Sequence, residues 1–551
     1  MDRRSLLRHG VAGAVTAVAG PALPRVVHAS EPAAPLPSLL PLPTFELEEA
    51  TVAQLQEGMR SGAYTARSIA ERFLARIDEI DRRGPAVNSV IEVNPDALAI
   101  ADACDQERRA GRVRGPLHGI PVLLKDNVDT ADRMRTSAGS LALAESIAPR
   151  DAFLVQRLRD AGAVILGKTN LSEWANFRST HSTSGWSARG GQTKNPYALD
   201  RNPCGSSSGS AVAVSANLAP LAVGTETDGS IVCPASACGI VGIKPTLGLV
   251  SRSGVIPIAH SQDTAGPMAR TVADAAALLG ALAGADPRDV AGTHAAGGGA
   301  SGGRVQADYT RFLDAAGLRG ARIGVARNFF GFSDAVDRVV GEAVAAMRSA
   351  GAVLVDPADI PTKGRFDDSE FEVLLYEFKT DVNVYLAGLG ARAPNRSLAD
   401  LIAFNERNRD REMPFFGQEI FVMAQKKGPL TTRAYRLALA KNHRLSRTLG
   451  IDAVLAKHRL DAIVAPTGSP AWPTDLLNGD HFTGGSSTMA AVAGYPSITI
   501  PAGFVRGLPV GISFFASAYS EPTLIKLAYA LEQALKARAA PRFLPTLDLR
   551  S

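Results

Sequence analysis

The sequence predicts an α/β protein whose central β-sheet is mixed, mainly parallel and covered by helices on both faces. Short apolar runs bounded by glycine and proline recur along the chain, and each is typical of a buried strand. Segments with helical spacing of apolar residues lie between these runs, which indicates a layered α/β architecture. The 551 residues, 46% hydrophobic and 21% charged, suffice for a large core of ordinary globular composition.

The predicted elements begin with two helices. Apolar residues recur at helical spacing between Thr65, which can cap the first helix, and Gly84, which ends it. The second helix opens at Asn94-Pro95, where proline suits the first turn, and runs toward Gly111. A strand at 121–124, a helix at 152–161 and a strand at 163–166 follow, and further strands are expected at 323–326, 462–465, 497–500 and 510–514.

The first 29 residues resemble a twin-arginine export signal and are set apart from the fold. Arg3-Arg4 precedes a run rich in Ala, Gly and Val, and Val27-His28-Ala29 forms a small-residue cleavage pattern. The run is too short for a membrane-spanning helix. We therefore expect the twin-arginine machinery to export the folded protein to the periplasm or beyond, without stable membrane association.

Residues 30–44 are predicted to form a Pro-rich leader, and residues 45–551 a single domain. Within that domain, residues 284–303 are dense in Gly and Ala and are expected to form a flexible surface loop. Residues 365–444 are mostly helical in pattern and more charged. They predict a helical flank, which is either a lid that shapes the substrate pocket or a plain solvated layer.

Charge and cysteine usage exclude several classes of function. The predicted signal accounts for much of the net charge of +5, so the remaining chain has no basic excess that would indicate binding to nucleic acid or an anionic membrane. The cysteines do not form a disulfide framework even though an oxidising compartment is expected, and buried thiols are the default interpretation for Cys104, Cys204, Cys233 and Cys238. Cys233 and Cys238 lack CxxC spacing and a nearby histidine, so no metal or other cofactor is expected.

Three motifs resemble known sites but stand in the wrong context. Residues 162–169 match the phosphate-loop pattern GxxxxGK[ST], yet the residues between the glycines are themselves a predicted strand, so Lys168 is expected to pack or pair. Residues 205–209 match the GxSxG nucleophile elbow with Ser207 at the centre, yet a proline-containing loop precedes them and no downstream histidine is marked as a base. The serine-glycine cluster at 484–487 is interpreted as a loop.

Three further segments together carry the chemistry, and they resemble the amidase signature family. These are the lysine that follows GIPV, the serine of a GSS triplet and a second serine in a GTETDGSI stretch, at 119–127, 205–207 and 224–231. Flanking stretches at 188–196 and 239–246 agree, and the resemblance covers residue 47 to the C-terminus. It implies the amidase signature fold, with Lys125 as the base, Ser206 as a bridging serine after a cis peptide bond, and Ser230 as the nucleophile.

The chemistry explains why such residues are needed. Without a histidine, the base must be a group that is neutral near neutral pH, and a lysine qualifies when burial lowers its pKa. The family mechanism implies that Lys125 takes a proton from Ser206, that Ser206 takes one from Ser230, and that Ser230 forms an acyl-enzyme which water hydrolyses. The backbone amides of Thr227, Asp228 and Gly229, with that of Ser230 itself, are candidates for the oxyanion hole.

Two departures from the family's usual sequence bear on the choice of substrate. Asp228 replaces the family's usual glycine and Val232 its usual arginine, and the Thr-Asp-Gly-Ser form resembles exported peptide amidases that act on C-terminal peptide amides. Asp228 can orient a substrate amide or cap a helix, and Asp228 and Gly205 are the candidate substrate-binding residues. The expected partner is therefore a small-molecule or peptide amide. One alternative is the A subunit of a tRNA-dependent glutamine amidotransferase, and the export signal argues against it. The other is a non-catalytic protein on an amidase scaffold, and retention of the lysine and both serines argues against that.

Overall fold

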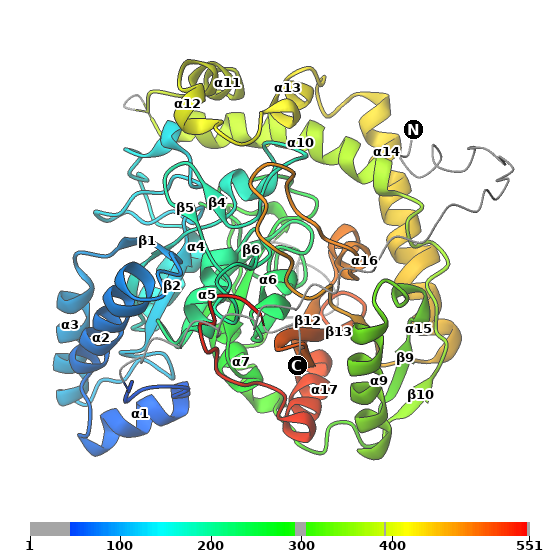
Figure 1. Cartoon of the computed structure of the whole chain (residues 1–551), viewed down its shortest axis with the longest axis horizontal. Coiled ribbons are helices and arrows are strands. Elements are labelled where there is room, and N and C mark those ends of the chain that lie inside the picture. The colour runs from blue at the N-terminus through cyan, green and yellow to red at the C-terminus, as the bar shows by residue number, and fades with distance from the viewer. Residues whose placement is uncertain (1–43, 292–304, 391–392, 548–551) are drawn as a thin grey trace, which may run out of the picture. The chain divides into compact units, whose positions relative to one another are not determined.

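One large β-sheet organises the chain. The computed structural model describes residues 44–291, 305–390 and 393–547, and eleven strands form this sheet (Figure 1). From edge to edge they are β1 (Val90–Val93), β3 (Val164–Thr169), β2 (Pro121–Lys125), β6 (Leu221–Glu226), β8 (Thr264–Ala269), β7 (Val241–Lys244), β12 (Ser497–Val505), β13 (Leu508–Phe515), β11 (Ala462–Pro466), β9 (Arg322–Val325) and β10 (Val353–Val355). Strands β4 (Trp186–Ser187) and β5 (Gly191–Gln192) form a separate ladder.

The predicted mixed sheet is confirmed. Parallel pairing joins β3, β2 and β6 in one group and β11, β9 and β10 in another. Antiparallel pairing joins the remaining neighbours, including the hairpin of β12 and β13, and these pairs outnumber the parallel ones. A short apolar run shows that a strand is buried but not in which direction its neighbour runs. The sequence analysis therefore predicted a larger share of parallel strand pairs than the sheet contains.

Helices pack along this sheet. The α-helices are α1 (Val52–Ser61), α2 (Ala66–Arg76), α3 (Ala97–Arg109), α4 (Phe153–Asp160), α5 (Ser208–Ser215), α6 (Val232–Ala237), α7 (Val272–Leu282), α9 (Asp334–Ser349), α10 (Asp367–Gly388), α11 (Leu398–Arg407), α12 (Arg409–Glu412), α13 (Glu419–Gln425), α14 (Arg433–His443), α15 (Asp452–His458), α16 (Ser487–Ala493) and α17 (Glu521–Leu535). Every residue of β2, β3 and β6 is buried. Because side chains alternate between the two faces of a strand, both faces of the sheet are covered there.

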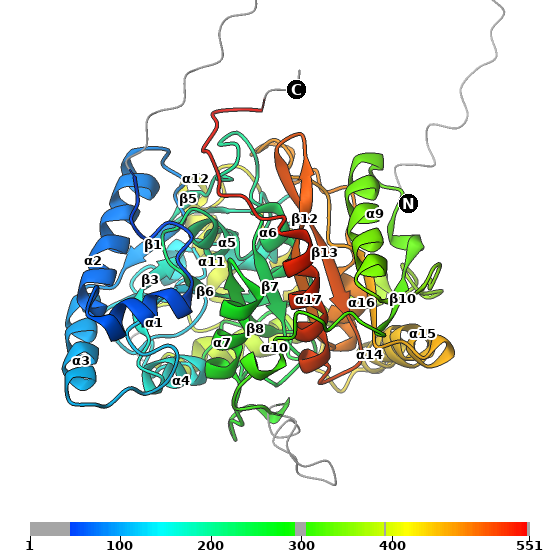
Figure 2. The ribbon, with the colours of Figure 1, turned by 90° about the horizontal axis from the view of Figure 1, so that it is seen from below.

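Short helical turns complete the secondary structure. The 3₁₀ turns are η3 (Leu141–Leu143), η4 (Glu173–Asn176), η5 (Thr310–Phe312) and η6 (Arg327–Phe329), and π-helical segments η2 (Ile77–Arg83) and η7 (Arg444–Ile451) extend α2 and α14. In Figure 2, α2 and α3 lie beside β1 and β3 at one end of the molecule, and α9 lies near β10 at the other.

The two predicted N-terminal helices differ in accuracy. The Thr65 hydroxyl accepts the Ser68 amide at 3.0 Å, so the first helix begins where predicted, and its π-helical extension ends before Gly84. The second helix begins at Ala97, two residues beyond Pro95. The Asn94 side chain instead bridges the Asp96 amide at 2.9 Å and the Ile165 carbonyl at 2.8 Å, which holds the preceding residues in a turn.

The predicted strands are all present. The sequence analysis missed β1, β6, β7, β8 and β10 of the large sheet and the short ladder of β4 and β5. Strand β6 has the sequence LAVGTE, and β8 has the sequence TAGPMA. Glycine and polar residues interrupt the apolar pattern in both, and β8 also contains a proline, so periodicity alone did not separate them from loops. The omission matters because β6 leads directly into the GTETDGSI stretch.

The predicted flank at 365–444 is helical. Helices α10 to α14 lie together along one side of the molecule (Figure 1). Phe378 and Phe421 stack with ring centroids 5.2 Å apart within an apolar cluster that also includes Trp174 and Phe177, separate from the core around the sheet. The flank therefore packs on the segment that precedes Ser206 and Ser230 rather than standing as a solvated layer.

Some predictions fall outside the described residues. The export signal at 1–29 and nearly all of the leader at 30–44 lie there, as does most of the predicted loop at 284–303. The part of the chain that the structure describes belongs to a unit that begins at Pro41. Among the helices of that part, none has the length and apolar character needed to cross a bilayer.

Candidate active site

Lys125 is the last residue of β2, and its side chain is fully buried. Its Nζ lies 2.7 Å from Oγ of Ser206 and 3.0 Å from Oγ of Ser207. It also lies 2.9 Å from Oγ1 and 3.3 Å from the carbonyl oxygen of Thr225. Parallel pairing of β2 with β6, in the register Leu124 with Val223, brings the strand ends that carry the lysine and the threonine together.

Burial lowers the pKa of Lys125 to about 7, because desolvation disfavours the ammonium form. The carboxylates of Glu226 and Asp263 oppose this shift without cancelling it. A substantial fraction of this lysine is therefore neutral near pH 7, as the sequence predicted for a base.

Ser206 follows a cis peptide bond from Gly205, as the resemblance implied. Gly205 has no room for a side chain, because an added Cβ would lie 2.9 Å from Oγ of Ser184 and closer still to the hydroxyl of Ser172. The Ser206 carbonyl accepts the Ser172 amide at 3.1 Å, which fixes the backbone at Ser206. Whether Gly205 contacts a substrate stays a prediction.

Ser207 precedes α5 and supports the lysine. Its hydroxyl donates to the Thr225 carbonyl at 2.9 Å and accepts the Thr225 amide at 3.1 Å. A loop precedes it, no histidine of the described chain contacts it, and its hydroxyl is buried among these partners. These contacts agree with the rejection of the nucleophile-elbow interpretation.

Ser230 lies in the turn between β6 and α6 and is 8% exposed. Its carbonyl accepts the Ser207 amide at 3.1 Å, so the two serine segments are in direct backbone contact. Among the described residues, no hydrogen bond involves the Ser230 hydroxyl. The structure thus brings together Lys125, Ser206 and the backbone of the Ser230 turn.

The turn before Ser230 has the features of an anion-binding site. Gly229 has a φ of 80°, and the amides of Thr227, Asp228, Gly229 and Ser230 donate to no acceptor in the described part of the chain. Behind the turn, Glu226 Oε2 accepts the amides of Ile231 at 2.8 Å and Val232 at 3.1 Å. Free amides in a fixed turn are the donors that a developing oxyanion needs.

Asp228 lies beside the start of α16, a contact that the sequence did not reveal. Its Oδ2 accepts the Thr488 hydroxyl at 2.7 Å, and its Oδ1 is buried without a partner among the described residues. Burial raises the pKa of this carboxyl, and the hydroxyls of Ser487 and Thr488 oppose the increase. The cluster at 484–487, predicted as a loop, therefore ends in a helix whose first residues line the site.

The remaining sequence motifs have structural explanations. Lys168 lies within β3, where its Nζ donates to the Val128 carbonyl at 2.8 Å and to the Thr136 hydroxyl at 3.0 Å, so it packs as expected. Two predicted thiols are instead joined, because Cys204 and Cys233 form a disulfide, whereas Cys104 and Cys238 are buried free thiols. The interpretation of all four as thiols was wrong because 29 residues separate a pair that only the fold brings together.

Among the described residues, one group of side chains could ligate a metal, and it is formed by His260 with Glu377 and Asp381 of α10. His260 Nδ1 lies 2.8 Å from Asp381 Oδ2, and Glu377 accepts the Tyr435 hydroxyl at 2.7 Å and the Ser261 amide at 2.9 Å. These bonds occupy both oxygens of the Glu377 carboxylate and join His260 to Asp381.

Comparison with known proteins places this site in a family. The model of the family described as Amidase matches residues 68–525. The chain belongs to the amidase family. A probable amidase of Arabidopsis thaliana is 43% identical over 509 residues, which cover 91% of this chain and 93% of that protein. The protein is accordingly an amide hydrolase with the amidase signature fold.

Two solved structures resemble this amidase closely. Native peptide amidase from Stenotrophomonas maltophilia is 54% identical with a TM-score of 0.85, covering 91% of this chain and 100% of that one. The peptide amidase PAM in complex with the competitive inhibitor chymostatin is 55% identical with a TM-score of 0.87, covering 90% and 100%. The A subunit of the glutamyl-tRNA(Gln) amidotransferase of Alkalilimnicola ehrlichii is a more distant relative. It is 36% identical over 507 residues, which cover 88% of this chain and 97% of that protein.

Proposed function

We propose that this amidase hydrolyses C-terminal peptide amides to the free acid and ammonia through Lys125, Ser206 and Ser230. The observation that carries this proposal is the distance of 2.7 Å between Lys125 Nζ and Ser206 Oγ in a fully buried position. The similarity to two peptide amidases at 54% and 55% identity supports the substrate class.

The hydrogen bonds around Lys125 specify how a neutral amine would act. A neutral amine has two N–H donors and one lone pair. The hydroxyl oxygens of Ser207 and Thr225, at 3.0 and 2.9 Å, can accept the two N–H groups. The lone pair then faces the Ser206 hydroxyl, which donates its proton to Nζ.

Proton transfer then reaches the substrate through the two serines. Ser206 takes the proton of Ser230 as its own proton passes to Lys125, and the Ser230 oxygen forms a bond to the amide carbon. The amides of the Thr227 to Ser230 turn stabilise the oxyanion. The carbon–nitrogen bond breaks as the proton returns to the leaving nitrogen, which departs as ammonia, and water then hydrolyses the ester on Ser230.

Asp228 is the proposed contact for the substrate amide group. Its Oδ1 has no partner among the described residues, and it lies one residue before Gly229 of the proposed oxyanion hole. An acceptor at this place can bind an N–H of the amide while the carbonyl oxygen occupies the hole.

An ammonia-release screen tests this function. We expect turnover of peptide amides to exceed that of aliphatic and aromatic amides, with no added metal, nucleotide or partner chain. The Ser230→Ala variant should be inactive and should lose labelling by a fluorophosphonate probe, with Ser349→Ala, at an exposed serine of α9, as the matched control. Turnover only with glutamine, tRNA and further subunits would favour the amidotransferase alternative instead.

We also propose that the protein is exported through its twin-arginine segment. The Cys204–Cys233 disulfide is compatible with an oxidising compartment, where such bonds persist. Cell fractionation and N-terminal sequencing of the mature chain test this, with the Arg3→Lys, Arg4→Lys double variant as control. Cytoplasmic retention of the full-length native chain would contradict it.

A further inference from the structure

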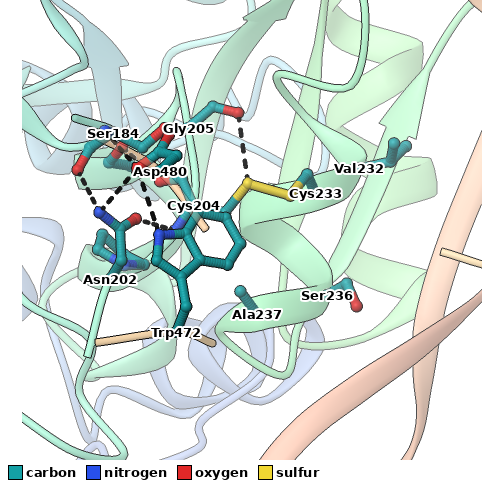
Figure 3. Close-up of a disulfide and its surroundings, with 12 residues drawn as sticks. Ser184, Asn202, Cys204, Gly205, Val232, Cys233, Ser236, Ala237, Trp472 and Asp480 are labelled. Atoms are coloured by element: carbon teal, nitrogen blue, oxygen red, sulfur yellow. Dashed lines mark hydrogen bonds between the residues drawn. A yellow bond between two sulfur atoms is a disulfide. The ribbon is translucent and has the colours of Figure 1, made fainter. Parts of the chain in front are cut away.

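The Cys204–Cys233 disulfide joins the two segments that carry the catalytic serines. Cys204 lies two residues before Ser206, and Cys233 lies three residues after Ser230. Their Cα atoms are 6.1 Å apart, and Figure 3 shows the bond between their sulfur atoms. The loop that this bond closes contains both serines. None of the reaction steps proposed above uses either sulfur atom.

The backbone of each cysteine is tied to its serine segment by hydrogen bonds. The Cys204 carbonyl accepts the Ser208 hydroxyl at 2.6 Å, which closes a turn around Ser206. The Cys233 amide donates to the Gly229 carbonyl at 2.8 Å, which closes a turn around Ser230. A displacement of either cysteine is therefore transmitted to the serine inside its turn.

A rigid polar and aromatic support holds the disulfide. Cys204 packs with Ala237 and Trp472 in a small apolar cluster, and Cys233 lies at its edge. The indole N–H of Trp472 lies 3.3 Å from Asp480, and the Ser184 hydroxyl donates to the same carboxylate at 2.5 Å (Figure 3). The Cys204 end is thus fixed to the body of the protein, so the bond places the Ser230 turn against a stable point.

We infer that Cys204 and Cys233 are positioning residues whose disulfide sets the distance between the bridging serine and the nucleophile. This inference rests on the proposed function. The Ser230 hydroxyl makes no hydrogen bond with Ser206 in the described chain, so backbone restraints must define its position. The backbone bond from Ser207 to Ser230 is one restraint, and the disulfide is a second, covalent one.

Reduction would therefore make the activity sensitive to redox conditions. Cys233 is partly exposed, so a small dithiol can approach the bond. The dithiol supplies two electrons and two protons, the sulfur–sulfur bond breaks to give two cysteine thiols, and the reductant becomes a cyclic disulfide. The serine segments then keep only their noncovalent restraints.

The test compares oxidised and reduced full-length enzyme on one peptide amide. Dithiothreitol is applied below the unfolding temperature, and differential alkylation with peptide mapping verifies which cysteines are reduced. We expect kcat to fall about 100-fold, as for a misplacement of about 1 Å, with KM within about twofold. The rate of fluorophosphonate labelling at Ser230 should fall with kcat, and reoxidation should restore both the labelling rate and kcat. The apparent pKa on the acid side of the pH profile of kcat/KM should stay unchanged.

Variants separate positioning from stability. The Cys204→Ser, Cys233→Ser double variant should show the same loss of kcat and no further change with dithiothreitol. The Cys104→Ser, Cys238→Ser double variant keeps the disulfide, so it should have native kcat when oxidised and lose it on reduction as the wild type does. Full kcat in the reduced enzyme would overturn the inference, as would a loss that follows unfolding measured by circular dichroism. An oxidised wild-type enzyme without amidase activity would instead refute the proposed function. In that case the rate of fluorophosphonate labelling at Ser230 still reports whether the disulfide positions the two serines.

Discussion

Replacement of Lys125 by Met is the perturbation that tests the reasoning most directly. Met has a similar length and no charge, so it fills the buried space beside Ser206 without the amine. The variant should therefore lose turnover while it keeps the fold. Lys125→Arg should also be inactive, because a guanidinium cannot deprotonate in this pH range.

The structure supplies the magnitude for the native enzyme. With the pKa of Lys125 lowered to about 7, about half of the amine is neutral at pH 7. About one molecule in eleven carries the neutral amine at pH 6, and about one in a hundred at pH 5. We expect kcat/KM to fall about tenfold per unit below pH 6 and to reach a plateau above pH 8.

Stability gives a second, independent magnitude. A decrease from 10.5 to about 7 corresponds to about 5 kcal/mol that opposes folding when the unfolded lysine is charged. Between these two pKa values the unfolded chain binds more protons, so the lysine's unfavourable contribution shrinks as pH rises. The free energy of unfolding should therefore increase by about 2 kcal/mol more in the native protein than in Lys125→Met between pH 7 and 9.

Two measurements check these values. Ammonia release from a peptide amide between pH 4.5 and 9 gives the profile of kcat/KM, and urea denaturation of both proteins at pH 7 and 9 gives the difference in stability. A flat profile between pH 5 and 8, or turnover by Lys125→Met, would refute the assignment of the base. Equal pH dependence of stability in both proteins would show that the buried amine stays charged.

The remaining predictions concern the surroundings of the base. Ser207→Ala removes a hydroxyl that makes three hydrogen bonds to Lys125 and Thr225, and it should lower kcat by about 10- to 100-fold, far less than the loss of Ser206 or Ser230. Thr225→Val removes an acceptor of the ammonium, so it should move the acid limb of the pH profile below pH 7. Gly205→Ala should cost about 1–3 kcal/mol of stability and most of the activity, because its Cβ would collide with Ser172. Gly341→Ala is the control: it has open space in α9 and should stabilise the protein by about 0.5–1 kcal/mol with unchanged activity.

Each of these has a clear contrary result. If Ser207→Ala were as inactive as Ser230→Ala, Ser207 would become a candidate for the nucleophile. An acid limb that moves to higher pH in Thr225→Val would mean that the threonine hydroxyl does not stabilise the ammonium. Equal stability and activity of the two glycine variants, measured by urea denaturation and ammonia release, would contradict the close packing at Gly205.

Sequence reasoning succeeded where a residue's chemistry is local. Strands such as β2 and β11 are short apolar runs, and the hydrophobic effect buries such runs whatever their neighbours are. The phosphate-loop match at 162–169 could be rejected because its central residues are themselves a strand, and β3 spans most of it. The order of strands in the sheet could not be obtained this way, since pairing depends on contacts between distant segments.

The same distinction between local sequence and distant contacts applies to the site. By itself, the sequence determined the family and led to the proposal of Lys125, Ser206 and Ser230 as the site, because the motifs around them are continuous stretches of chain. Only the tertiary structure decided the burial that lowers the pKa of the lysine, its contacts with Ser207 and Thr225, and the disulfide beside the serines. The physical reason is that desolvation and hydrogen bonding depend on neighbours in space, and the pairing of β2 with β6 places segments about 100 residues apart side by side.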